Sequence, residues 1–221
     1  MSKSYGQADP RLASYVERVF RLEHELFAEI ETRADAAGLP RIQVSLFEGR
    51  HLELLTRAIG ARRAVEIGTL AGYSGLSILR GLTPDGTLDS FELDARHAAV
   101  ARATFDRNGF GARARIHVGP AASGLAAIED RGPFDLVFID ADKKGYPFYL
   151  DWAARHLRSG GVVLLDNAFA WRQVLDVVAG EPADAGARAI HAANELLARG
   201  RPFLATMWPT QEGLAMGVKT S

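Results

Sequence analysis

The sequence predicts an α/β fold built on a mostly parallel sheet. From about Arg63 onward, short apolar stretches alternate with longer helical ones, which is typical of parallel strands joined by helices. Two further apolar stretches near the end of the chain are separated only by a short turn, so they are expected to pair antiparallel as a hairpin. The 221 residues, 48% of them apolar, are enough for one substantial core, so we expect a single domain.

Each predicted strand is a run of apolar residues bounded by turn signals. Helices of about three turns between them would cover both faces of the sheet. The seven strands are expected at 64–67, 87–93, 114–118, 135–140, 161–166, 202–209 and 213–219. The intervening and following helices are expected at 73–82, 95–108, 121–129, 145–157 and 184–198.

Extra helices are expected ahead of this alternating region. Asp9 followed by Pro10 indicates a helix start, because proline is favoured at the first helical position. Apolar residues then recur at roughly helical spacing from Val16 to Ile30, and the sequence from Gly38 to Pro40 ends that segment. A second helix is expected over 46–59.

Composition narrows the classes of function. With 26 basic and 27 acidic residues the net charge is −1, which disfavours a nucleic acid or an anionic membrane as partner. The chain has no cysteine, which excludes disulfides and thiolate chemistry and suits a reducing cytoplasm. We find no apolar stretch long enough for a membrane span and no apolar leader, so we expect a soluble cytoplasmic protein.

The first strand runs into a glycine-containing loop, VEIGTLAGYSG, and then into a helix. Gly68, Gly72 and Gly75 would let the backbone approach a nucleotide-like cofactor closely. Their spacing is neither GxGxxG nor that of a phosphate-binding P-loop, which favours a cofactor without phosphates. Glu66, at the end of the strand, would repel a polyphosphate and would suit an ammonium group.

The second strand closes with FELD and places Glu92 some two dozen residues after the glycine loop. An acid in that position is suited to accept hydrogen bonds from the two hydroxyls of a ribose. The alternative is a solvated strand end. For Asp94 we favour a different role, that of capping the next helix.

Two other strands also end in polar side chains. DLVFIDADKKGY leads from a buried-type strand into Asp140, Asp142 and Lys143, and VVLLDN leads into Asp166 and Asn167. Ligands usually bind outside the carboxyl ends of parallel strands. These two stretches therefore predict one shared site.

Taken together, VEIGTLAGYS, FELD, FIDADKKGY and LLDN resemble, in this order and spacing, the metal-dependent catechol and caffeoyl-CoA O-methyltransferase family. The resemblance covers roughly residues 40–219. It implies a Rossmann-like fold of the class I S-adenosylmethionine-dependent methyltransferases, with residues 61–221 as the core and 1–60 as helices that cover the substrate or join a homodimer.

The resemblance also implies a site. One divalent cation, Mg²⁺ in the first place with Ca²⁺ and Mn²⁺ as alternatives, would be bound by Asp140, Asp166 and Asn167, whose hard oxygens suit it. S-adenosylmethionine would lie along a set of residues from the glycine loop and the neighbouring strand ends. These are Val44, Glu66, Gly68, Thr69, Gly72, Ser74, Glu92, Ala121, Asp140 and Asp142.

The expected substrate is a small aromatic molecule with two vicinal hydroxyls. A phenol with a pKa of about 10 is a poor nucleophile at neutral pH, but it loses its proton more readily when it chelates a dication. Lys143 would accept that proton as general base, beside Asp140. Methyl transfer is then a direct displacement without a covalent enzyme intermediate.

Other readings are weaker. VFIDADK partly matches the DxD strand of haloacid-dehalogenase-type phosphatases, but Lys144 stands where these enzymes have threonine or valine, and the strand lies past mid-chain. A regulator that binds the cofactor without catalysis would not need the cluster around Lys143. A methyltransferase acting on RNA is disfavoured by the balanced charge, whereas a non-catechol small molecule stays open as substrate.

The stretch AFAWRQV departs from the family pattern after LLDN. Many relatives have a tryptophan and then a turn with glycine, whereas here Trp171 comes one position later and no glycine follows. Because this loop would border the substrate, substrate preferences cannot be carried over. For Tyr146 and Trp152 we favour packing of a helix over stacking on a substrate.

Overall fold

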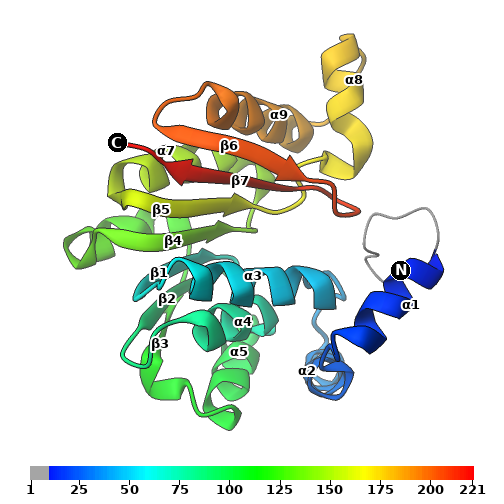
Figure 1. Cartoon of the computed structure of the whole chain (residues 1–221), viewed down its shortest axis with the longest axis vertical. Coiled ribbons are helices and arrows are strands. Elements are labelled where there is room, and N and C mark those ends of the chain that lie inside the picture. Colours follow the sequence, from blue (N-terminus) through cyan, green and yellow to red (C-terminus); the bar gives the residue numbers. More distant parts are fainter. Residues whose placement is uncertain (1–9) are drawn as a thin grey trace.

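The computed structural model describes residues 10–221 and has one seven-stranded sheet (Figure 1). The strand order is β3-β2-β1-β4-β5-β7-β6. The fold class, the number of strands and the final hairpin are confirmed. The strands are β1 Arg63–Ile67, β2 Thr87–Glu92, β3 Ala114–Val118, β4 Phe134–Ile139, β5 Leu157–Leu165, β6 Phe203–Trp208 and β7 Leu214–Lys219.

Six of the seven strands in the described chain run in the same direction, and β7 runs opposite to them. β3, β2, β1, β4 and β5 pair parallel, while β7 pairs antiparallel with both β5 and β6. β1 and β4 lie side by side at the centre, although β2 follows β1 in the chain. The strand order thus reverses at this pair, which is where parallel sheets usually open to a ligand.

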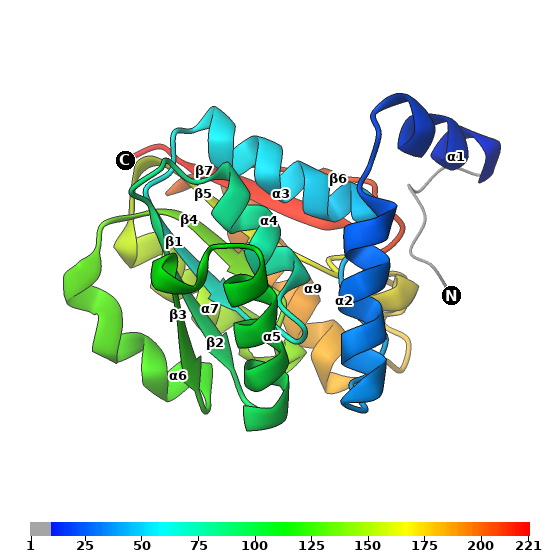
Figure 2. The same cartoon turned by 90° about the horizontal axis from the view of Figure 1, so that it is seen from below.

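Helices cover both faces of the sheet. Alternate side chains of each central strand pack on opposite sides, so that Phe138 contacts the core under α3, α4 and α5 and Val137 contacts the core under α7 and α9. Figure 2 shows these two layers of helices on either side of the strands. The α-helices are α1 Pro10–Val19, α2 His24–Ala36, α3 Leu46–Ala58, α4 Tyr73–Gly81, α5 Ala95–Arg107, α6 Ala121–Gly124, α7 Tyr146–His156, α8 Gln173–Ala179 and α9 Ala185–Ala198.

The first N-terminal segment is two helices and not one continuous helix. The chain leaves the helical conformation after α1, and Arg21 has a left-handed φ of 49° before α2 begins at His24. Leu22 is buried at this break, and Glu23 forms an ion pair with Arg80 of α4, so contacts distant in sequence favour the bend over a continuous helix. Asp9, the expected cap, lies outside the described residues.

Two other stretches differ from the predicted elements. Where we expected a helix at 121–129, the structure has only the single turn of α6 and then a 3₁₀ helix over Leu125–Arg131. Gly124 at that junction lowers helix propensity and lies close to Phe91, where a Cβ would be 2.8 Å from the ring. We did not predict α8, although Gly180 after it, with φ 75°, is a typical helix end.

No helix in the described part of the chain is long and apolar enough to span a membrane. The cytoplasmic location stays a prediction.

Candidate functional site

The carboxyl ends of β4 and β5 place two aspartates at neighbouring positions on the same edge of the sheet. Ile139 and Leu165 are register partners at the ends of these strands, so Asp140 and Asp166, the next residue of each strand, follow the same pair. The N–H of Asp166 donates to the carbonyl of Ile139 at 3.0 Å, which holds the ends of the two strands against each other. The structure therefore brings these two predicted residues together, and Asn167 follows directly.

Lys143 lies between the two strand ends. Its Nζ donates to Oδ1 of Asp140 at 2.9 Å and to the hydroxyl of Tyr146 at 2.8 Å. That hydroxyl in turn donates to the backbone carbonyl of Asp166 at 3.0 Å. A continuous chain of hydrogen bonds thus joins the end of β4 to the end of β5.

Burial marks Asp166 and Asn167 as more than a solvated strand end. Asp166 is fully buried and Asn167 is 5% exposed. Asn167 also has a left-handed φ of 55°, a conformation that asparagine tolerates better than most residues. Buried carboxylates need strong compensation from hydrogen bonds, ion pairs or metal ions.

The donor set at these strand ends fits a hard divalent cation. Two carboxylates and one amide supply oxygen ligands, the type that Mg²⁺, Ca²⁺ and Mn²⁺ prefer. Among residues 10–221 no group of three histidine, cysteine, aspartate or glutamate side chains has a metal-binding arrangement. The candidate trio is not of that kind, because Asn167 supplies its third oxygen.

The glycine loop after β1 needs glycine at two positions. Gly68 has a φ of 94°, and a Cβ there would lie 2.1 Å from the backbone oxygen of Asp140. Gly72 has a φ of 86° and directly precedes α4 as its N-cap residue, where a Cβ would lie 3.0 Å from Ala101. The loop is therefore packed directly against the end of β4, next to the two carboxylates.

Glu92 closes the same loop from the end of β2. Its Oε2 accepts hydrogen bonds from the backbone N–H groups of Thr69 at 3.3 Å and Leu70 at 2.9 Å. Its Oε1 accepts from the N–H of Asp94 at 3.0 Å. Asp94 itself caps α5 by accepting from Arg96 N–H, as predicted.

Glu66 lies beneath the loop with no exposed surface. Its two carboxylate oxygens accept hydrogen bonds from the hydroxyls of Ser74 and Ser90, both at 2.6 Å. Burial raises the pKa of Glu66 to about 7, against the opposing effect of the two serines. This carboxyl thus ties β1, β2 and α4 together from inside the fold.

The other predicted cofactor residues lie around this loop. Asp142 is exposed, and its Oδ1 accepts a hydrogen bond of 2.6 Å from the hydroxyl of Tyr149. Ala121 begins α6, beyond the end of β3. Val44 is buried just ahead of Ser45, which caps α3 through a capping box. Their contact with a cofactor stays a prediction.

Sequence reasoning undervalued two tyrosines of α7. Tyr146 is buried, as predicted, and so is Tyr149, for which we predicted no role; each hydroxyl also forms a hydrogen bond with a residue of the predicted site. Burial raises the pKa of Tyr146 well above its ordinary value. The spacing of three residues between Lys143 and Tyr146 was the available signal, because such residues lie on one face of a helical turn.

The loop after Asn167 has an unusual backbone. Ala170, Trp171 and Arg172 have φ values of 47°, 51° and 73°, and the side chain of Asn194 donates a hydrogen bond of 2.7 Å to the carbonyl of Ala168. Trp171 is 54% exposed. Consecutive left-handed residues other than glycine are uncommon and costly, and they concentrate at functional sites.

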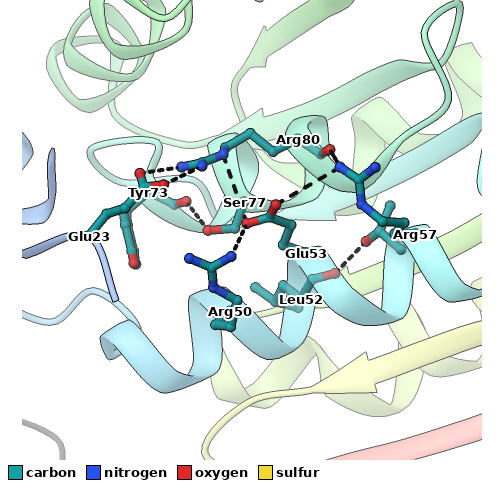
Figure 3. A network of polar contacts seen from close by, with 9 residues as sticks. Glu23, Arg50, Leu52, Glu53, Arg57, Tyr73, Ser77 and Arg80 are labelled. Carbon is teal, nitrogen blue, oxygen red and sulfur yellow. Dashed lines mark hydrogen bonds and ion pairs between the residues drawn. The ribbon is translucent and has the colours of Figure 1, made fainter. Parts of the chain in front are cut away.

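A network of ion pairs connects the N-terminal helices to α4, the helix that starts at the glycine loop (Figure 3). Arg80 of α4 donates two hydrogen bonds to Glu23, ahead of α2, at 2.6 and 2.5 Å. Its Nε lies 3.8 Å from Glu53 of α3, which also lies 3.5 Å from Arg50. Tyr73, the first residue of α4, packs edge-on against Phe27 of α2 in the same region.

Comparisons with known proteins agree with this arrangement. The sequence profile of a family described as O-methyltransferase matches residues 17–220. A catechol O-methyltransferase of Niastella koreensis is 38% identical over 180 residues, covering 80% of this chain and 81% of the relative.

Two solved structures superpose well. An O-methyltransferase from Bacillus cereus, in complex with SAH, has a TM-score of 0.87 and 33% identity, covering 95% of this chain and 97% of its own. The O-methyltransferase TomG from Streptomyces achromogenes, involved in tomaymycin synthesis and in complex with SAM, has a TM-score of 0.86 and 32% identity, with 96% of each chain covered.

Proposed function

The chain belongs to the family of S-adenosylmethionine-dependent O-methyltransferases, and from this premise we propose that it methylates one hydroxyl of a small catechol-like substrate with the help of a divalent cation. The observation that carries the proposal is the meeting of Asp140 and Asp166 at neighbouring strand ends, with Lys143 bonded to the first. The name of the Niastella koreensis relative supports a catechol-type substrate.

In this proposal Asp140, Asp166 and Asn167 hold the cation, preferably Mg²⁺. When bound, the cation makes a neighbouring substrate hydroxyl more acidic and holds it in place. Buried and partly buried oxygens on rigid strand ends suit this role, because a site on strands is held more precisely than one on mobile loops.

Lys143 is the proposed general base. When neutral, it accepts the proton of the substrate hydroxyl, while its bonds to Asp140 and Tyr146 keep Nζ at the strand ends. The substrate oxygen then forms its bond to the methyl carbon as the bond between that carbon and sulfur breaks. The protein contributes alignment of these atoms and forms no covalent bond itself.

The cofactor site is proposed along the glycine loop and the ends of β2 and β4. Glu92 lies at the loop. When the cofactor binds, the Glu92 carboxylate would accept hydrogen bonds from the ribose hydroxyls in place of those from the loop N–H groups. Glu66 supports the loop from below and, when ionised, would supply negative charge toward an ammonium group. The full proposed set is Val44, Glu66, Gly68, Thr69, Gly72, Ser74, Glu92, Ala121, Asp140 and Asp142.

The test is a methylation assay with S-adenosylmethionine and a panel of vicinal dihydroxy aromatics, read by mass spectrometry. We expect activity that EDTA abolishes and Mg²⁺ restores. Asp140→Ala should reduce turnover by at least about a hundredfold while the cofactor still binds. Activity that persists in EDTA would contradict the proposed metal dependence. Methylation only of compounds with a single hydroxyl would contradict the proposed catechol-like substrate.

We also propose that residues 1–221 form a single domain. We further propose that two copies of the chain form a homodimer through their N-terminal helices. Figures 1 and 2 both show α1 projecting from the body, and its apolar Leu12, Tyr15 and Val19 are 47%, 52% and 48% exposed. Light scattering should give twice the chain mass, and Tyr15→Asp should lower it. A monomeric wild type would overturn this.

A further inference from the structure

Tyr146, the first residue of α7, has no exposed surface, yet its hydroxyl sits between two parts of the proposed site. It lies 2.8 Å from Nζ of Lys143 and 3.0 Å from the backbone oxygen of Asp166. The ammonium also lies 4.9 Å from the centre of the tyrosine ring. One side chain therefore contacts both the proposed base and the end of β5.

The direction of these hydrogen bonds follows from the donors available. A tyrosine hydroxyl has one hydrogen, and a backbone carbonyl can only accept, so that hydrogen points to Asp166. The hydroxyl must then accept from Lys143, in the ammonium and in the neutral amine alike. Since Asp140 takes a second N–H, two of the three positions around Nζ are fixed by partners in the described chain.

We propose that Tyr146 is a positioning residue that orients Lys143, so that the third position on Nζ points away from the hydroxyl and remains available to the substrate. The inference rests on the proposed role of Lys143 as base. The geometry explains why a hydroxyl is needed here. A phenylalanine at this position would fill the same space in the core, but Nζ of Lys143 would then keep only its hydrogen bond to Asp140.

Tyr149 is a matched control. It is also buried on α7, but its hydroxyl donates to Asp142 and makes no hydrogen bond with Lys143. Tyr149→Phe thus removes an equivalent hydroxyl from the same helix. Lys144 is an internal reference, because it is exposed and adjacent in sequence.

The first experiment measures Lys143 in the full chain without cofactor or metal. The protein is treated briefly with acetic anhydride, and acetylation of Lys143 and Lys144 is quantified by mass spectrometry. In Tyr146→Phe we expect Lys143 to react about fivefold faster, because one of its two hydrogen bonds is lost, while Lys144 is unchanged. Tyr149→Phe should leave Lys143 at its wild-type rate. An equal rate in all three proteins would overturn the contact.

The second experiment is a double-mutant cycle in the assay with S-adenosylmethionine and a catechol. Tyr146→Phe should lower kcat about tenfold and change KM for the cofactor less than twofold. In a Lys143→Met background the same substitution should change kcat less than twofold, because the group it orients is gone. An equal loss in both backgrounds would show a merely structural role and overturn the proposal.

The two experiments separate the inference from the proposed function. If the wild type methylates no substrate, the proposed function fails, while acetylation still decides whether Tyr146 holds Lys143. Should Tyr146→Phe fail to fold, as judged by circular dichroism, 4-fluorophenylalanine at this position fills the space of the hydroxyl without replacing its hydrogen bonds. The same two outcomes then apply.

Discussion

Gly68 shows how a single residue joins the cofactor loop to the end of β4. Its φ of 94° is unfavourable for other residues, and an added Cβ would lie 2.1 Å from the backbone oxygen of Asp140. That oxygen belongs to the backbone and cannot rotate away as a side chain could. The loop and the strand end must therefore shift if a side chain is present.

Gly68→Ala should accordingly lower the unfolding free energy much more than Gly60→Ala does. Gly60 also has a positive φ, of 60°, but nothing lies within 4 Å of an added Cβ. We expect a loss of about 1 kcal/mol in unfolding free energy for Gly60→Ala, from backbone strain, and at least about 3 kcal/mol for Gly68→Ala. Urea unfolding measures both, and equal losses would contradict the close contact.

Glu66 gives the folded state a dependence on pH. Its pKa is about 7 in the folded protein, because of burial, and near 4.5 when unfolded. Between these values the unfolded chain releases its proton while the folded chain keeps it. The contribution of Glu66 to stability therefore falls as the pH rises from about 4.5 to 7, by a few kcal/mol in all.

Glu66→Gln should remove this dependence, since glutamine has no proton to lose. The difference in unfolding free energy between the variant and the wild type should increase in favour of the variant from pH 4.5 to 7 and then level off. Urea titrations in EDTA, without cofactor, measure it, and Glu181→Gln on the exposed surface is the control. A difference that does not change with pH would mean that the pKa of Glu66 is not raised in the folded protein.

Some of the residues that form the candidate site could be predicted from the sequence. Asp140 and Asp166 could be paired because each follows a run of buried apolar residues, and parallel strands end at one edge. The position of Glu66 under the loop was not readable, because its partners Ser74 and Ser90 come from two other elements. Contacts of that kind depend on packing and not on local pattern.

Among the elements, the strands and the helix at 46–59, which is α3, were predictable, whereas the break between α1 and α2 was not. Runs such as 135–140 carry an apolar pattern that survives in β4, Phe134–Ile139. The break between α1 and α2 depends on Glu23 reaching Arg80, a contact 57 residues away in sequence. The backbone of the loop at Trp171 likewise has no sequence signal, because left-handed φ values at non-glycine residues are held by the surroundings.

Arg80→Met tests whether the ion pairs hold α2 against the core. The substitution removes both hydrogen bonds to Glu23, so hydrogen exchange of α2 amides, at 24–36, should become several times faster. The global unfolding free energy should fall by no more than about 1 kcal/mol, because the pair is partly exposed. Arg155→Met, which breaks an exposed pair on α7, is the control, and unchanged exchange in α2 would contradict the link.

At the scale of the whole molecule, the site is assembled where the strand order reverses. The loop after β1 and the ends of β4 and β5 come from the three central strands of the seven-stranded sheet, and both faces of these strands are buried under helices. Figure 1 shows α1 and α2 on the side to which the arrowheads of β4 and β5 point. In the proposed function, these N-terminal helices would border the substrate.

The most direct measurement is a titration of the purified chain with Mn²⁺, followed by electron paramagnetic resonance of the free ion. We predict one bound Mn²⁺ per chain, and affinity at least about tenfold weaker in Asp140→Ala and Asp166→Ala. Asp142→Ala, whose carboxylate bonds to Tyr149, should bind as the wild type does. No binding, or binding that neither of the first two substitutions weakens, would contradict a cation held between the ends of β4 and β5.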